Sequence, residues 1–203
     1  MIQLNEIEVR VLGALIEKQL STPEYYPLTL NSLTTACNQK NNRDPVVEFD
    51  DKVVLRAVDH LRELKLAQMI HQATSRVPKY GHQMEEVFPL NQAELVVMCE
   101  LLLRGPQTVG ELRGHCKRLH EFASLEEVEA LVQGLSTRND GQFVMQLPQQ
   151  SGRKEPRFAQ LLAGAPPVET IVAAAPVERV RVDLQAENER LAKLEAEIAA
   201  LRQ

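Results

Sequence analysis

The feature that most constrains the fold of this 203-residue chain is an internal duplication. The segments 4–8, Leu-Asn-Glu-Ile-Glu, and 90–94, Leu-Asn-Gln-Ala-Glu, each place an Asn three residues before a Glu. Such an Asn accepts free amide groups of a first helical turn, and the Glu reaches back to the Asn amide. Apolar residues recur at helical spacing after both segments. Each segment therefore opens the first helix of a repeated unit.

Two further helices are predicted in each copy. Thr29 and Thr108 stand where a capping hydroxyl begins a short second helix, and Leu33 and Cys37 recur as Leu112 and Cys116 at the same offset. Asp50 in the first copy and Ser124 in the second precede a third run of apolar residues at helical spacing. Each unit is therefore expected to contain three helices.

A β-hairpin is expected after each third helix. In the first copy it runs from residues 68–72 through a tip at Pro78 and Gly81 to a return at 84–88, and in the second from 143–147 through 151–152 to 157–158. Three helices and a hairpin, twice, predict a mainly α fold with small β-hairpins (α+β), organised as tandem winged-helix domains over residues 1–88 and 89–162.

The remaining residues differ in composition. Residues 163–176 are rich in Ala and Pro and are expected to form a linker. Residues 177–203 carry a heptad repeat typical of a coiled-coil helix, which predicts a parallel homodimer, with docking on its own chain as the alternative. The residues expected to make the dimer are Leu184, Leu191, Leu194, Ile198 and Leu201.

Several function classes find no support in the sequence. The first residues lack the basic lead and long apolar stretch of a signal peptide, and no segment has the apolar length of a membrane span, so a cytoplasmic protein is expected. Cys37, Cys99 and Cys116 lack metal-site spacing and are expected to be buried, reduced thiols. No catalytic or cofactor-binding motif is present, so neither an enzyme nor a cofactor is expected.

Double-stranded DNA is the expected partner, because a winged helix commonly places its third helix in the major groove and its wing on phosphate. Acidic residues on the same third helix, such as Asp51 and Glu63, argue against strong nonspecific affinity. In the second domain that helix is acidic, which suits protein contact at least equally. The predicted DNA contacts are Lys40, Asn42, Arg43, Lys52, Arg56, Arg76, Lys79, Arg153 and Lys154.

Four separated motifs resemble the YceH family of bacterial proteins. They are 37–46, Cys-Asn-Gln-Lys-Asn-Asn-Arg-Asp-Pro-Val; 76–82, Arg-Val-Pro-Lys-Tyr-Gly-His; 104–113, Arg-Gly-Pro-Gln-Thr-Val-Gly-Glu-Leu-Arg; and 151–158, Ser-Gly-Arg-Lys-Glu-Pro-Arg-Phe. The resemblance covers residues 1–162 and implies a tandem winged-helix protein of bacterial cytoplasm with no established activity. The linker and heptad tail are expected to lie outside the shared part.

Two functions follow from these features. The first is a DNA-binding protein, regulating transcription, in which the first domain makes the main contacts and the tail makes a dimer. The alternative is a protein-interaction adaptor that binds partner proteins through the second domain and the C-terminal helix. A continuous positive surface in the folded protein favours the first function, and scattered charges favour the second.

Overall fold

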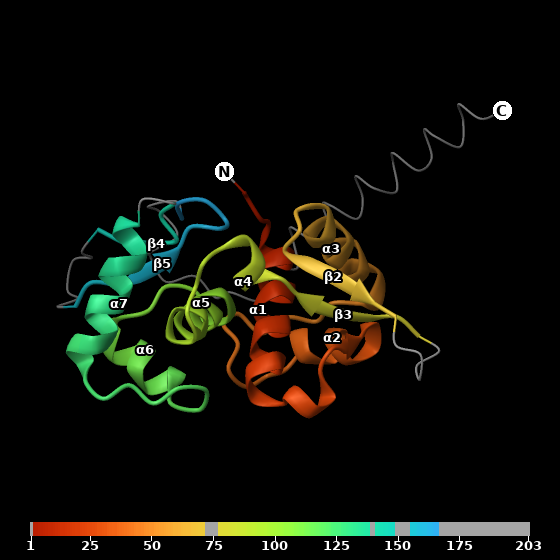
Figure 1. Ribbon diagram of the computed structural model, residues 1–203, viewed down its shortest axis with the longest axis horizontal. Coiled ribbons are helices and arrows are strands. Elements are labelled where there is room, and N and C mark those ends of the chain that lie inside the picture. The colour runs from red at the N-terminus through yellow and green to blue at the C-terminus, as the bar shows by residue number, and fades with distance from the viewer. Residues whose placement is uncertain (1, 72–76, 139–140, 149–154, 167–203) are drawn as a thin grey trace.

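The computed structural model describes residues 2–71, 77–138, 141–148 and 155–166, which form a mixed α+β structure of helices and two small antiparallel sheets (Figure 1). The first half of this part consists of the elements α1 (Glu6–Ser21), the short 3-10 helix η1 (Pro23–Tyr25), β1 (Leu28–Thr29), α2 (Leu30–Cys37), α3 (Asp51–Glu63), β2 (Ala67–Ile70), β3 (Lys79–His82) and α4 (Met84–Val87). The second half consists of α5 (Gln92–Arg104), α6 (Val109–Cys116), α7 (Leu125–Thr137), β4 (Val144–Gln146) and β5 (Phe158–Gln160).

The predicted helix starts are confirmed by their capping groups. Asn5 and Asn91 form complete capping boxes with Glu8 and Glu94, so α1 and α5 begin in the same way. Side-chain oxygens also cap the other predicted helices, each contributing about 1 kcal/mol to helix stability. These caps are Thr29 for α2, Asp50 for α3, Thr108 for α6 and Ser124 for α7.

The first sheet has the strand order β1-β3-β2, with β3 antiparallel to both neighbours. The short strand β1, which pairs Leu28 with Tyr80, was not expected from the sequence. The prediction that residues 84–88 form the returning strand is wrong, because β3 occupies 79–82 and Met84–Val87 is helical. Gly81 therefore lies inside a strand, not at the hairpin tip.

The second sheet repeats this plan with fewer residues. Strands β4 and β5 are antiparallel, and Gln107 forms an isolated bridge to Phe158 at the place that β1 takes in the first half. Mutual backbone bonds between Gln107 and Phe158 of 3.0 and 2.8 Å hold this bridge. Helix, short extended segment, two helices and a hairpin therefore follow in the same order in both halves.

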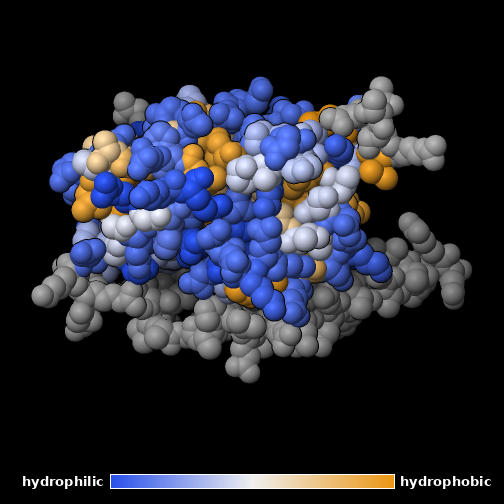
Figure 2. Space-filling model, turned by 90° about the horizontal axis from the view of Figure 1, so that it is seen from below, coloured by the Kyte–Doolittle hydropathy of each residue, from blue (hydrophilic) through white to orange (hydrophobic). Residues whose placement is uncertain are grey.

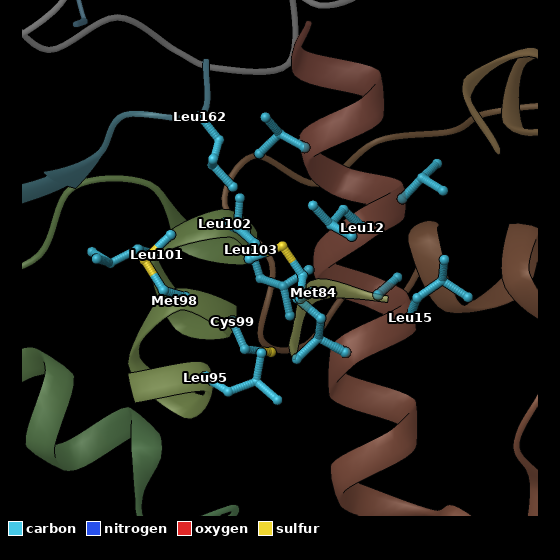
Figure 3. Close-up of a cluster of buried hydrophobic side chains, with 14 of the residues drawn as sticks. Leu12, Leu15, Met84, Leu95, Met98, Cys99, Leu101, Leu102, Leu103 and Leu162 are labelled. Atoms are coloured by element: carbon cyan, nitrogen blue, oxygen red, sulfur yellow. The ribbon is translucent and has the colours of Figure 1, made fainter. Parts of the chain in front are cut away.

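The two halves share one hydrophobic core, because α1 and α5 lie side by side at the centre of the molecule (Figure 1). Figure 3 shows Leu12 and Leu15 of α1 across from the leucines of α5, with Met84 and Leu162 on the same cluster. The Cys99 thiol lies 3.6 Å from the Gly13 carbonyl oxygen, so the helices approach closely at a residue without a side chain. The backbone amide of Leu4 also donates to Leu162, at 2.6 Å.

None of the described helices is both long and apolar enough to cross a membrane.

Candidate nucleic-acid interface and the junction of the two halves

The described residues among the predicted DNA contacts on the first half lie on one helix, in the loop before it and on a strand. Lys52 and Arg56 are exposed on α3, one helical turn apart, and Lys40 is exposed in the loop after α2. Lys79 is half-buried on β3, where its backbone pairs with Thr29 and Ile70. Other predicted residues lie outside the described part of the chain, as does the rest of the coiled-coil prediction. They are Arg76, Arg153, Lys154 and the tail residues Leu184, Leu191, Leu194, Ile198 and Leu201.

The loop between α2 and α3 is closed by Asn38. Its side-chain amide donates to the Phe49 carbonyl oxygen at 2.8 Å, and its side-chain oxygen accepts from the Phe49 amide at 2.8 Å. These two bonds join the end of α2 to the residue before the α3 cap. Lys40 follows Asn38 by two residues and Lys52 follows Phe49 by three, so both lysines are close in the sequence to these hydrogen bonds.

Helix α2 contributes an exposed side without charge, made of Asn31, Ser32 and Thr35. We use the name α2–α3 surface for the exposed residues Asn31, Ser32, Thr35, Lys40, Asn41, Lys52 and Arg56. Figure 2 shows the molecule from the side on which α2 and α6 lie, and its described part is mostly hydrophilic with small separate apolar areas. Such a face suits a polar ligand better than it suits a partner with a broad apolar surface.

The prediction that Arg43 contacts DNA needs correction, because its side chain lies inside the protein. The residue is 5% exposed, and its guanidinium donates to both carboxylate oxygens of Glu17, with the Nη1–Oε1 contact at 3.0 Å. It also donates to the Ala36 carbonyl oxygen at 2.8 Å. Arg43 therefore ties the loop to α1 and to the end of α2.

Asn42, another predicted contact, is engaged in a similar way. Its backbone takes a left-handed φ of 59°, a conformation that Asn tolerates better than most residues. Its side-chain oxygen accepts a hydrogen bond of 2.5 Å from Arg104 at the end of α5. The backbone amide of Asp44 donates to Leu103 at 3.0 Å. The second half thus holds the loop in place.

Charged side chains gather where these segments meet, and sequence reasoning missed this group. Glu17 of α1 is 1% exposed and Glu100 of α5 is 0% exposed. Arg118, after α6, donates to Glu17 and to Glu100 at 2.7 Å each, and Arg104 donates to Glu100 at 3.1 Å. We call this group the junction cluster; its members are Arg10, Glu17, Lys18, Arg43, Glu100, Arg104 and Arg118.

The environment of the cluster sets its protonation. Burial raises the pKa of Glu17, but the hydrogen bonds and charge of Arg43 outweigh it and hold that pKa below its usual value. Arg10 is 4% exposed and donates to carbonyl oxygens of Cys37, Pro45 and Leu103. Burial, and then the charge of Arg43, lower the pKa of Arg10 to about 10, so both groups are charged at neutral pH.

His82, the last residue of β3, is 6% exposed. Its backbone amide donates to the Tyr26 hydroxyl at 2.6 Å, and its Nδ1 accepts from the Met84 amide at 3.3 Å. Burial lowers the pKa of His82 to about 4, so the ring is neutral at pH 7. This histidine connects the end of β3 to the start of α4.

The second half presents a different surface. On α7 the exposed charged side chains are all acidic, namely Glu126, Glu127 and Glu129. His115 and His120, which stand near Cys116 in the sequence, have partners of their own: His115 Nδ1 lies 2.6 Å from the Gln107 side-chain oxygen, and His120 packs edge-on against Phe122. All three cysteines are buried and free, as predicted.

Comparison with known proteins places the sequence among uncharacterised ones. A family model described as "Protein of unknown function, DUF480" matches residues 4–153. A UPF0502 protein of Geobacter sulfurreducens is 55% identical over 201 residues, covering 98% of this chain and 90% of the relative. A UPF0502 protein of Opitutus terrae is 49% identical over 199 residues, covering 98% and 83%. The family model ends at residue 153, as expected for a tail outside the shared part of the family, whereas these alignments with individual relatives run past residue 162.

Proposed function

We propose that this chain, which belongs to the DUF480 family of proteins of unknown function, binds duplex DNA through the α2–α3 surface of its first half. The proposal includes a tandem winged-helix fold, which the repeated order of helix, extended segment, two helices and hairpin supports. It also includes a role in transcription regulation and a relationship to the YceH family, which the sequence motifs resemble. Pairing of two chains through residues 177–203 remains a prediction outside the described residues.

The observation that carries the proposal is the contrast between the two third helices. Helix α3 exposes Lys52 and Arg56 one turn apart, together with the acidic Asp51 and Glu63, whereas the exposed charges of α7 are all acidic. Phosphate repels carboxylates and attracts Lys and Arg, so only the first of these helices suits a DNA groove. The two halves therefore differ in the property that DNA binding requires, although their helices begin and follow one another alike.

Two acidic side chains at α3 are engaged within the protein, whereas Asp51 and Glu63 are exposed. The Asp50 carboxylate accepts a hydrogen bond of 2.8 Å from the Val53 amide as the helix cap. The Asp59 carboxylate pairs with Arg62 at 2.7 Å. The uncharged exposed side of α2 adds side chains that donate and accept hydrogen bonds without repelling phosphate.

Titration of the intact chain with duplex DNA at several salt concentrations tests the proposal. Replacing a residue that contacts phosphate reduces the slope of log affinity against log salt by about one unit. Lys52→Ala and Lys40→Ala are expected to reduce it, and Lys117→Ala, which removes the same charge from an exposed position in the second half, is expected to leave it unchanged. Unchanged slopes for Lys40→Ala and Lys52→Ala, or no saturable binding by the native chain at low salt, would refute the proposal.

A second candidate function, a protein-interaction adaptor, is favoured by the exposed side of α7. Leu125 is 45% exposed there, beside Glu126 and Glu129. An exposed apolar side chain beside acidic ones suits a partner that has basic residues around its apolar contact. Substituting both glutamates by Lys is expected to abolish capture of such a partner while the DNA titration stays unchanged. Equal capture by the native and doubly substituted chains would exclude this surface.

A further inference from the structure

The junction cluster contains more positive than negative charge. Its cations are Arg10, Lys18, Arg43, Arg104 and Arg118. The carboxylates that face them are Glu17, Glu100 and Asp44, the last through its effect on Arg10. Five cations against three carboxylates leave a surplus of two positive charges. Such a surplus is costly in a partly buried site, and an anion that entered the site would relieve the cost.

The surplus reaches the surface through three side chains from both halves. The Glu17 and Glu100 carboxylates are almost fully buried, whereas the side chains of Lys18, Arg104 and Arg118 are 19%, 21% and 29% exposed. Arg104 and Arg118 bind opposite oxygens of the one Glu100 carboxylate, and Arg118 also reaches Glu17, which lies 3.9 Å from Lys18. The three exposed cations are therefore linked through two buried carboxylates.

Both arginines have N–H groups that donate to no acceptor among the described residues. Arg104 uses Nε for Glu100 and Nη2 for Asn42, and its Nη1 donates to none of the described residues. Arg118 uses Nη1 for Glu17 and Nη2 for Glu100, and its Nε has no acceptor in the described part of the chain. The Lys18 ammonium donates to Gln39 at 3.3 Å and carries three hydrogens in all. Each of the three side chains can therefore donate a hydrogen bond to a further acceptor group.

We infer that the junction of the two halves is a phosphate-binding site, in which Lys18, Arg104 and Arg118 bind the phosphate oxygens. A phosphate group carries up to two negative charges and several acceptor oxygens, which matches both the charge surplus and the unused donors. Guanidinium groups suit phosphate because their planar fork bonds two oxygens together. The phosphate belongs either to a DNA backbone or to a small phosphorylated molecule, and the site does not depend on DNA binding by the α2–α3 surface.

Inorganic phosphate is the probe, added to the intact chain while chloride keeps the ionic strength constant. The Nε–H resonances of Arg104 and Arg118 in nitrogen–proton NMR spectra are expected to shift and saturate. Lys18→Met leaves Glu17 bound by Arg43 and Arg118, so the fold is retained, and phosphate affinity is expected to fall about tenfold for the lost charged contact. Lys117→Met removes an exposed lysine next to Arg118 in sequence and is expected to bind phosphate like the native chain.

Shifts that do not saturate, or equal losses in Lys18→Met and Lys117→Met, would overturn the site. A DNA titration of the same variants separates the two sources of phosphate. If the salt slope falls by about one unit in Lys18→Met, the site holds a backbone phosphate. If the native chain binds phosphate saturably but the salt slope for DNA is unchanged in Lys18→Met, the site takes a small phosphorylated molecule. The same holds if phosphate binds and no DNA binds at all. In that second case the DNA proposal fails, whereas the phosphate site is supported.

Discussion

Arg43 and Glu17 form a two-pronged ion pair inside the protein, between the loop after α2 and the central helix α1. The pair fixes the loop that carries Lys40 and Asn41, and Arg118 joins it to the second half. The position of the loop that carries Lys40 therefore depends on contacts made by the second half.

Removal of Arg43 is expected to destabilise the fold. Arg43→Met leaves the buried Glu17 carboxylate without its closest partner, and breaking a buried pair in this way costs about 3 to 5 kcal/mol. Lys40→Ala, in the same loop but exposed, is expected to change the free energy of unfolding by less than about 0.5 kcal/mol. Urea denaturation measures both, and equal midpoints for the two variants would contradict the buried role of Arg43.

Glycine positions in two helices give a matched test of how α1 packs on α5. A Cβ at Gly13 would lie 2.9 Å from Leu103 Cδ2 and 3.1 Å from Leu102 Cβ, whereas a Cβ at Gly134 in α7 has nothing within 4 Å. Ala favours a helix over Gly by about 1 kcal/mol. Gly134→Ala is therefore expected to raise the melting temperature and Gly13→Ala to lower it. A rise in both would mean that the helices are not so closely packed.

The buried His82 ring predicts a dependence of stability on acid. Its pKa is about 4 in the folded chain, against 6.5 for an ordinary histidine, so the unfolded chain binds a proton more readily between these values. The stability present above pH 6.5 is expected to be lost as the pH falls toward 4, by about 3 kcal/mol. His82→Gln removes this contribution but leaves the acidic groups that also titrate. Urea unfolding of both chains at pH 7 and pH 4.5 measures it, and parallel losses would exclude His82 as the cause.

The three cysteines are expected to be unreactive in the folded chain. Burial raises the pKa of the Cys37 and Cys116 thiols to about 12 and that of Cys99 well above its usual range. Since the thiolate is the reactive form, a disulfide reagent at pH 8 should label none of them until urea is added. Rapid labelling of a thiol without denaturant would show that its part of the core opens readily.

Local signals in the sequence predicted the helices well and the charged interior poorly. Asn5, Asp50 and Thr108 cap their helices because capping depends on residues only a few positions apart. The role of Arg43 depends on Glu17, which lies 26 positions earlier in the chain and on another element. No periodicity or motif of the chain expresses such a contact.

Glu100 illustrates the same limit in a segment whose helical pattern was recognised. It interrupts an apolar run in α5, which from the sequence alone only argues against a membrane span. In the fold it accepts from Arg104 and Arg118 and is fully buried. Likewise β1 has two residues and exists through its pairing with β3, so its own sequence carries too little pattern to predict it.

The most direct test of DNA binding by the first half is to map a short duplex onto the intact chain by NMR. Addition of the duplex is expected to shift backbone amide resonances of residues 31–41 and 52–56, which carry the α2–α3 surface, and to leave those of 125–137 on the acidic α7 in place. Shifts confined to residues 125–137, or none at a duplex concentration of about 1 mM, which exceeds the Kd of about 0.1 mM for weak nonspecific binding, would contradict the account.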